Sequence, residues 1–315
     1  MTQTLLLPPR DRLALSSPLV ISGAKDRAVR RAAASGDLVT LGHGVHVAAD
    51  AWREADDDER FRLRIAAARR VSRSEPVLSH AAAAFIWDLP WIGPWPAQVP
   101  ATDPTRAFTR SAQLVRWHAA PLAVGDVVRC EGVLVTDPHR TSIDLALTLP
   151  FPEAVAIIDG CLNRGLSTRA DLSARLDGRK SARRAMSARR ALAFGDPGAA
   201  SAGESLSRVA IAESGLCAPE LQRAFHDHRG LIGYVDFWWA EAGVVGEFDG
   251  VKKYLRSVYR GGRSMEQVLL DEKRRSDRLL AAPGVRRLVR WGWKEARDPA
   301  LLRAVLASVG VTGRR

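Results

Sequence analysis

The chain has 315 residues, enough for two or three domains that each bury a core. Lys and Arg number 47 against 35 Asp and Glu, which gives a formal net charge of +12, while hydrophobic residues make up an average 46%. The excess cations therefore belong to surfaces, and nucleic acid is the partner that such a charge predicts. The sequence lacks a long apolar run, a basic n-region and a CxxC pair. These absences argue against a spanning helix, a signal peptide and a zinc site, and they predict a cytoplasmic protein with no membrane partner.

The N-terminal region, residues 1–50, reads as a short basic helix followed by a hairpin. The helix ends at Gly36, and the hairpin turns at Gly42-His43-Gly44. This is the order of recognition helix and wing in a winged-helix domain, and it predicts DNA phosphate contacts from Lys25, Arg27, Arg30 and Arg31. A solvated amphipathic helix beside a small hairpin is the alternative. The segment from Gly23 to Val47 also resembles the winged-helix domain of AbiEi-type antitoxins, which implies promoter binding and a toxin partner.

Residues 51–165 are expected to form a middle domain of mixed α and β structure. The element that begins Leu78-Ser79-His80 and the strand and helix from Val133 to Ala146 resemble the middle region of AbiEi-like proteins, to which we assign no chemistry. The isolated histidines of this region are interpreted as structural groups. Its tryptophans alternate with prolines, so we interpret them as core or loop anchors and not as a base-stacking platform; they are Trp87, Trp91 and Trp95.

Residues 166–200 are expected to form a basic helical segment and a linker. Nine Lys and Arg residues fall between positions 164 and 190, against Asp171 and Asp177 alone. Such a run is either a solvated helix pair or a surface that follows a phosphate backbone. The breaker-rich stretch from Gly195 to Gly203 then predicts a domain boundary near residue 200.

The stretch from Tyr234 to Gly250 predicts two strands joined by a tight turn. If the turn is centred on Glu241-Ala242, Asp236 lies opposite Glu247, and Asp249 shares their face. Like charges at this distance repel, so the face requires a divalent cation or a basic partner, unless it is an ordinary solvated face. The other face is non-polar and is expected to pack on a core; it consists of Val235, Phe237, Trp239, Val244, Gly246 and Phe248.

The C-terminal region, residues 201–315, follows the order helix, hairpin, helix, strand. Glu204 heads the first helix, and Ser264 with Gln267 has the capping-box spacing for a second helix that reaches Leu280. This order predicts a mixed sheet flanked by helices. The ordered motifs resemble the PD-(D/E)XK nuclease superfamily, and within it the Vsr-like mismatch endonucleases. The whole chain is therefore expected to be an α+β multidomain protein with a winged helix, a mixed middle region and a restriction-endonuclease-like domain.

The nuclease resemblance implies a magnesium site that cleaves DNA phosphodiester bonds. It assigns Asp236, Glu247 and Asp249 to the metal, and Glu204, Asp236, Glu247 and Lys273 to catalysis. The surrounding positive charge predicts nucleic-acid contacts from Lys252, Lys253, Arg274 and Arg275.

Two departures from the family pattern concern this site. Asp249 stands where many members carry Lys, and Lys252-Lys253-Tyr254 follows Gly250 where the Vsr-like branch usually carries His. Two functions are therefore left open. One is a magnesium-dependent DNA endonuclease guided by the winged helix, and the other is an AbiEi-like regulator whose nuclease-like domain is inactive.

Overall fold

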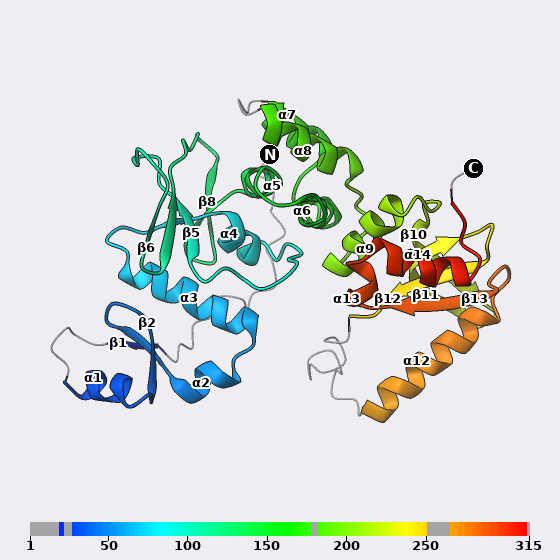
Figure 1. Cartoon of the computed structure of the whole chain (residues 1–315), viewed down its shortest axis with the longest axis horizontal. Coiled ribbons are helices and arrows are strands. Elements are labelled where there is room, and N and C mark those ends of the chain that lie inside the picture. The colour runs from blue at the N-terminus through cyan, green and yellow to red at the C-terminus, as the bar shows by residue number, and fades with distance from the viewer. Residues whose placement is uncertain (1–18, 22–26, 178–181, 251–264, 314–315) are drawn as a thin grey trace. The chain divides into compact units, whose positions relative to one another are not determined.

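The structure is a computed structural model that describes residues 19–21, 27–177, 182–250 and 265–313 (Figure 1). It confirms the expected multidomain α+β class. The chain divides into two compact units: the first spans Met1–Leu149 and Gly165–Leu192, and the second spans Pro150–Arg164 and Ala193–Arg315. Within the described ranges, no helix combines the length and the apolar character needed to cross a membrane.

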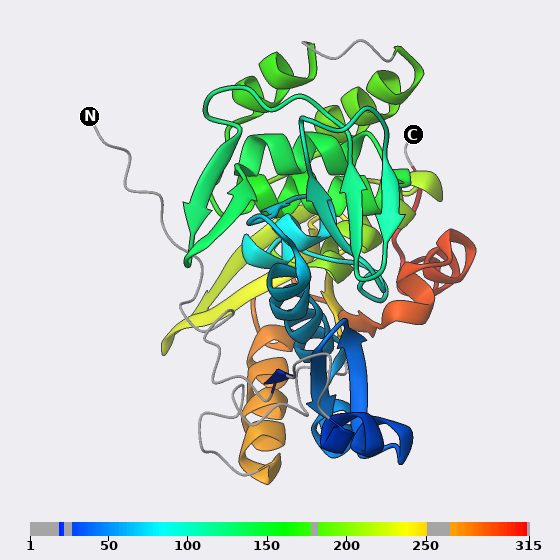
Figure 2. The same ribbon diagram turned by 90° about the vertical axis from the view of Figure 1, so that its left-hand side faces the viewer.

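The first unit begins with a small three-stranded sheet of order β1-β3-β2 and a short helix (Figure 2). Its elements are β1 (Leu19–Ile21), α1 (Arg27–Ala34), β2 (Leu38–Gly42) and β3 (Val45–Ala48). Gly36 has a φ of +86°, which lets the chain leave α1, and Gly44 has a φ of +69° in the turn between β2 and β3. The predicted order of basic helix and hairpin is confirmed.

The rest of the first unit is built on a six-stranded mixed sheet of order β6-β7-β5-β4-β9-β8. Its elements are α2 (Ala49–Glu54), α3 (Asp57–Val71), β4 (Val77–Leu78), α4 (His80–Ile86), β5 (Val99–Thr102), β6 (Arg110–Ala112), β7 (Val115–His118), β8 (Val127–Cys130), β9 (Val133–Thr136), α5 (Pro138–Ala146), α7 (Arg169–Asp177) and α8 (Ala182–Phe194). Trp87 is buried and donates to the Thr136 carbonyl over 2.8 Å, and Trp95 stacks on Phe61. These two tryptophans are core anchors, as predicted.

Two sets of polar side chains in the interior of the first unit contact one another. Arg140 is buried, and its guanidinium binds Asp144 over 2.6 Å and Asp126 over 2.8 Å. The rings of His80 and His118 stack with centroids 3.9 Å apart. Burial, with the nearby charge of His80, lowers the pKa of His118 to about 4, so this ring is neutral at physiological pH. The structural role predicted for His80 and His118 agrees with this packing.

From α9 to β13 the second unit has the element order α-β-β-β-α-β, which builds a four-stranded sheet, β10-β11-β12-β13. Its elements are α6 (Phe151–Asn163), α9 (Ala202–Glu213), β10 (Glu220–Asp227), β11 (Gly230–Trp239), β12 (Val244–Phe248), α12 (Met265–Leu280), β13 (Arg287–Trp291), α13 (Trp293–Ala296) and α14 (Pro299–Ser308). Strands β10, β11 and β12 are antiparallel neighbours, whereas β12 and β13 are parallel. The sequence-based order omitted β10, because this edge strand is mostly polar and its one buried side chain is Phe225.

Helix α6 belongs to the second unit, although the sequence placed it at the end of the middle domain. The physical reason is a buried ion pair between α6 and α9. Asp159 is fully buried, and its Oδ2 lies 2.6 Å from Nη1 of Arg208. The backbone N–H of Asp196 also donates to Asp159. The unit boundary at residues 192 and 193 lies near the boundary predicted at residue 200.

The hairpin of β11 and β12 has the register predicted from its turn. Phe237 pairs with Gly246, and Trp239 pairs with Val244, so the turn is centred on Glu241-Ala242. The non-polar face packs on α9, where Trp291 of β13 donates to the Ser207 hydroxyl over 2.8 Å. Val235, predicted for this face, instead belongs to the same core cluster as Leu279 of α12. The opposite face is covered by α12, whose Leu279 joins a cluster that includes Trp238 and Val245 (Figure 1). The face that carries the acids is therefore also largely buried.

Candidate functional site

Glu204 lies in the first turn of α9 and is bound by groups of its own helix start. Ser201 is the N-cap residue; its hydroxyl accepts from the Glu204 N–H and donates to Glu204 Oε1 over 2.7 Å. The Ala200 N–H donates to Oε2 over 2.9 Å, and the Gln222 amide donates to the same oxygen over 3.1 Å. The Ser-x-x-Glu spacing is the signature of a capping box. Local helix capping thus accounts for most contacts of Glu204.

Asp236 lies where β11 and β12 separate, next to the last recorded pair of their ladder, Phe237 and Gly246. Its Oδ2 accepts the Phe248 N–H over 2.8 Å and so satisfies a donor that the ladder leaves free. The Gln222 amide lies 3.4 Å from Asp236 Oδ1. Gln222 therefore links Asp236 to Glu204. Sequence reasoning missed Gln222, because the register that places it opposite Asp236 comes from β10.

Glu247 is held between two arginines and is 8% exposed. Its Oε1 accepts from Nη1 of Arg275 over 2.5 Å, and its Oε2 accepts from Nε of Arg290 over 3.0 Å. Arg290 stands directly across the parallel ladder and also binds Glu272 and Ser276. The repulsion between the acids was expected to require a divalent cation or a basic partner. In the structure, Arg275 and Arg290 are the basic partners of Glu247.

The remaining predicted site residues lie on α12, at the end of β12 or outside the described residues. Lys273 is exposed on α12, and the cations that contact Glu247 are Arg275 and Arg290. Asp249 is half-buried, and its N–H donates to the Trp291 carbonyl over 2.8 Å. Arg274 is exposed beside Asp271. Lys25, Lys252 and Lys253 lie outside the described residues.

The acids, as they lie, do not form a donor set for magnesium. Across the ranges that the structure describes, no group of three or more His, Cys, Asp or Glu side chains is placed to hold a metal ion. Magnesium requires oxygen ligands with lone pairs available to it. Both oxygens of Glu247 accept from arginines, and both oxygens of Glu204 accept from Ser201, Ala200 or Gln222. This arrangement does not fit the ion.

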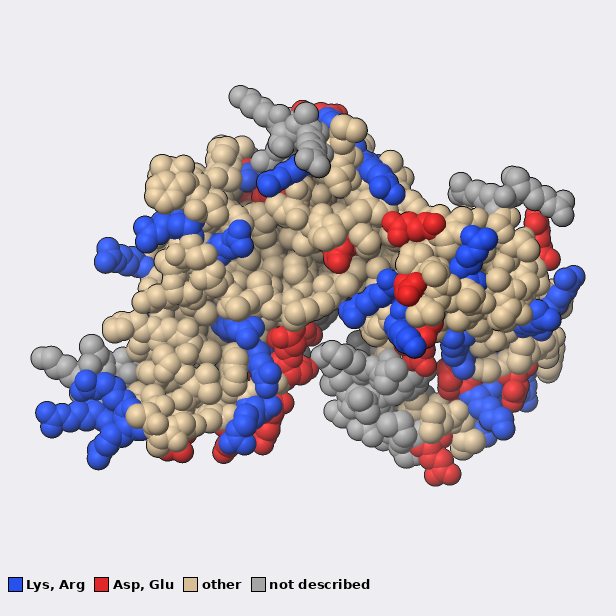
Figure 3. Space-filling model, in the orientation of Figure 1, with Lys and Arg blue, Asp and Glu red and all other residues tan. Residues whose placement is uncertain are grey.

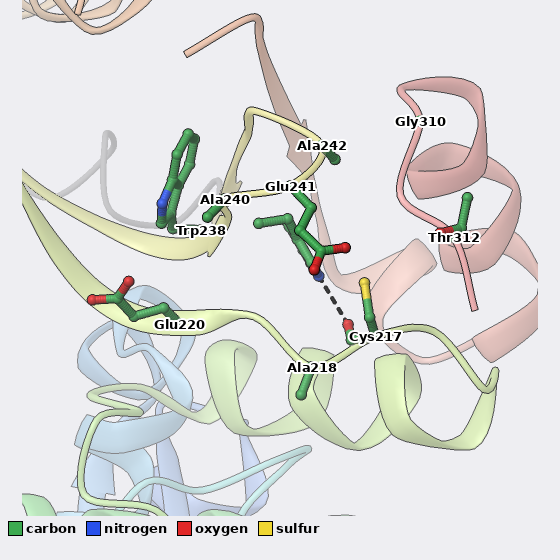
Figure 4. Close-up of a pocket in the computed structure, with 10 residues that line it drawn as sticks. Cys217, Ala218, Glu220, Trp238, Ala240, Glu241, Ala242, Gly310 and Thr312 are labelled. Carbon is green, nitrogen blue, oxygen red and sulfur yellow. Dashed lines mark hydrogen bonds between the residues drawn. The ribbon is translucent and has the colours of Figure 1, made fainter. Parts of the chain in front are cut away.

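A cavity of about 450 Å³ lies at the turn of the hairpin (Figure 4). The Trp239 indole N–H donates to the Cys217 carbonyl across one wall, over 2.9 Å. The lining residues are Cys217, Ala218, Glu220, Trp238, Trp239, Ala240, Glu241, Ala242, Gly310 and Thr312. Glu204, Asp236 and Glu247 do not line this cavity, so it is separate from the predicted site.

Helix α1 presents the predicted nucleic-acid contacts on one exposed face. Arg27, Arg30 and Arg31 are exposed, and their spacing of three and four residues aligns them along the helix. The helix contains no acidic residue. Basic side chains gather over α1 in the space-filling view (Figure 3). The exposed tip of the adjoining hairpin carries His43.

Comparison with known proteins finds relatives without an assigned activity. Two uncharacterized proteins of Mycobacterium tuberculosis, from strains CDC 1551 / Oshkosh and ATCC 25618 / H37Rv, are each 30% identical to the chain over 174 residues. The match covers 51% of this chain and 64% of each relative, so the chain spans just under two thirds of their length. No family model matches the chain.

Proposed function

We propose that the chain is a DNA-binding regulator of the AbiEi-like antitoxin type, whose second unit keeps the element order of a nuclease without a working metal site. Under this proposal the protein acts in the cytoplasm on its own promoter, and a toxin is its protein partner. The observation that carries the proposal is the pairing of Glu247 with Arg275 and Arg290. This pairing neutralises an acid that a nuclease of this type would need for its metal.

The DNA-binding part of the proposal rests on α1. Arg27, Arg30 and Arg31 form a face that carries three positive charges and no opposing acid on the helix. Arginine presents its N–H groups in a planar fork that matches phosphate oxygens. A helix of this kind directly before a hairpin is suited to lie in a groove of DNA. The arginines would then contact the DNA phosphate backbone, and the hairpin would lie next to the helix. The net charge of +12 adds a long-range attraction to DNA.

The test is binding of the full chain to a labelled duplex from the region upstream of its own gene, compared with a shuffled duplex. We expect Arg30→Ala to weaken binding. The slope of log K against log salt should fall by about one, which corresponds to the loss of one phosphate contact. Arg110→Ala removes an exposed arginine of β6 and is the matched control. Equal binding by wild type and Arg30→Ala, or no preference for the upstream duplex, would contradict the proposal.

The second candidate is a magnesium-dependent DNA endonuclease. It is favoured by the α-β-β-β-α-β order and by the register that brings Asp236 and Glu247 to neighbouring positions on adjacent strands. For this candidate to hold, Arg275 and Arg290 must release the Glu247 carboxylate when the metal ion binds. Titration of the full chain with Mg²⁺, followed by calorimetry, tests it: binding in the wild type that is lost in Glu247→Ala would favour this candidate over the regulator.

A further inference from the structure

A pocket walled by arginines lies where α12 meets the β10–β11 turn, within the second unit. Its volume is about 500 Å³, and the lining residues are Arg229, Asp271, Arg274, Arg275, Asp277 and Arg278. Four arginines and two aspartates line it, and two of the arginines, Arg275 and Arg278, are paired with acids outside the lining. The proposed function assigns no role to this pocket, because its DNA contacts lie on α1.

Two of the arginines form a fixed wall. Arg278 binds Asp227 through both Nε and Nη2, each over 2.7 Å. This bidentate pair holds the pKa of Asp227 well below its usual range, so Asp227 is charged and its charge is matched by Arg278. Arg275 donates to Glu247 and, through Nη2, to the Tyr234 carbonyl over 2.8 Å. Both side chains are therefore held in place before any ligand arrives.

The other two arginines present their guanidinium groups to solvent. The Arg274 side chain is 75% exposed, and its nearest acid, Asp271, is 3.7 Å away and 50% exposed. Such a surface pair is weak, and a phosphate can replace it at little cost. Arg229 is exposed on the β10–β11 turn, where its N–H donates to Asp227 over 2.8 Å and fixes the backbone. Arg229 and Arg274 are thus the exposed arginines of the pocket lining.

We propose that this pocket binds backbone phosphate of duplex DNA, with Arg229 and Arg274 as the contacting side chains. The inference rests on the proposed function for its ligand, but it assigns a second contact surface that is independent of α1. Arginine binds phosphate oxygens with two parallel N–H groups, and Arg275 and Arg278, which are already paired with Glu247 and Asp227, shape the pocket without competing for the ligand.

The experiment measures binding of the full chain to a labelled duplex of arbitrary sequence by fluorescence anisotropy, between about 50 and 200 mM salt. The test variant is Arg229→Gln with Arg274→Gln. The control is Arg73→Gln with Arg110→Gln, which removes two exposed arginines of the first unit. We expect the test variant to weaken binding about tenfold and to lower the slope of log K against log salt by about two, whereas the control leaves both unchanged.

The inference is overturned if the test variant binds with the wild-type affinity and salt slope while its circular dichroism is unaltered. Titration with inorganic phosphate alone, followed by calorimetry, distinguishes a site for DNA phosphate from a site for a free anion. Phosphate binding that is lost in the test variant, with DNA binding intact, identifies a free-anion site and also overturns the inference. Failure here is distinguishable from failure of the proposed function, because that function depends on the effect of Arg30→Ala with the upstream duplex.

Discussion

At the residue scale, Glu247 is better explained as a counter-ion than as a metal ligand. Both of its oxygens accept from arginines, and the side chain is almost fully buried. Removing the charge leaves Arg275 and Arg290 facing a neutral group, with Glu272 as the acid that still contacts them. Hydrogen bonds to charged groups contribute about 1.5–3 kcal/mol each.

We therefore expect Glu247→Gln to lower the free energy of unfolding by about 1.5–3 kcal/mol in metal-free buffer, measured by urea denaturation. Asp271→Asn, at an exposed acid of α12, is the control and should change stability by less than about 0.5 kcal/mol. If Glu247 belonged instead to a set of acids waiting for a metal, its neutralisation would relieve repulsion. An unchanged or higher stability of Glu247→Gln would therefore count against the counter-ion role.

At the scale of elements, the hairpin of β11 and β12 depends on a close approach at Gly246. A Cβ at this position would lie 2.6 Å from Cη2 of Trp291 and 2.9 Å from Trp239. Two large rings of a buried face would have to move to accept it. We expect Gly246→Ala to destabilise the protein by about 1–3 kcal/mol, measured by thermal or urea unfolding. Gly250→Ala is the control, since its nearest atom would be 3.4 Å away; equal effects of the two changes would contradict this packing.

The hairpin of β11 and β12 shows which features of the site could be predicted from the sequence and which could not. Its register could be predicted, because a tight turn and the two-residue alternation are local signals. The partners of Glu247 could not be predicted from the sequence. Arg290 is brought next to Glu247 by the parallel pairing of β12 and β13, and Arg275 by the packing of α12 on the sheet, and neither is a local signal. Glu204 carried a readable signal in the Ser-x-x-Glu spacing, which predicts a helix cap as readily as a catalytic acid.

At the scale of the whole molecule, the units are not continuous in sequence. The second unit takes α6 from a position before α7 and α8, and the ion pair of Asp159 with Arg208 joins it to α9. Changes in composition and flexible linkers predict domain boundaries between consecutive segments of the chain. They do not reveal a helix such as α6, which precedes the last helices of the first unit in sequence but packs in the second unit. The domain division predicted from sequence differed at α6 for this reason.

Breaking this ion pair should affect the second unit strongly. Asp159 is fully buried and Arg208 nearly so, and removal of Asp159 leaves Arg208 with the more distant carboxylate of Asp196, 3.8 Å away. We expect Asp159→Ala to lower the free energy of unfolding by about 3–5 kcal/mol in chemical denaturation. Asp196→Ala provides the comparison, because Asp196 is 45% exposed and lies 3.8 Å from Arg208. A cost for Asp159→Ala no larger than that for Asp196→Ala would show that α6 is held by other contacts.

We propose that the protein binds DNA and that its nuclease-like unit does not cut it. Incubation of the full chain with supercoiled plasmid and Mg²⁺ tests this most directly, with binding followed in parallel by gel shift. We predict a shifted plasmid that stays supercoiled, for the wild type and for Asp236→Ala alike. Nicking by the wild type that disappears in Asp236→Ala would contradict the account and establish the endonuclease instead.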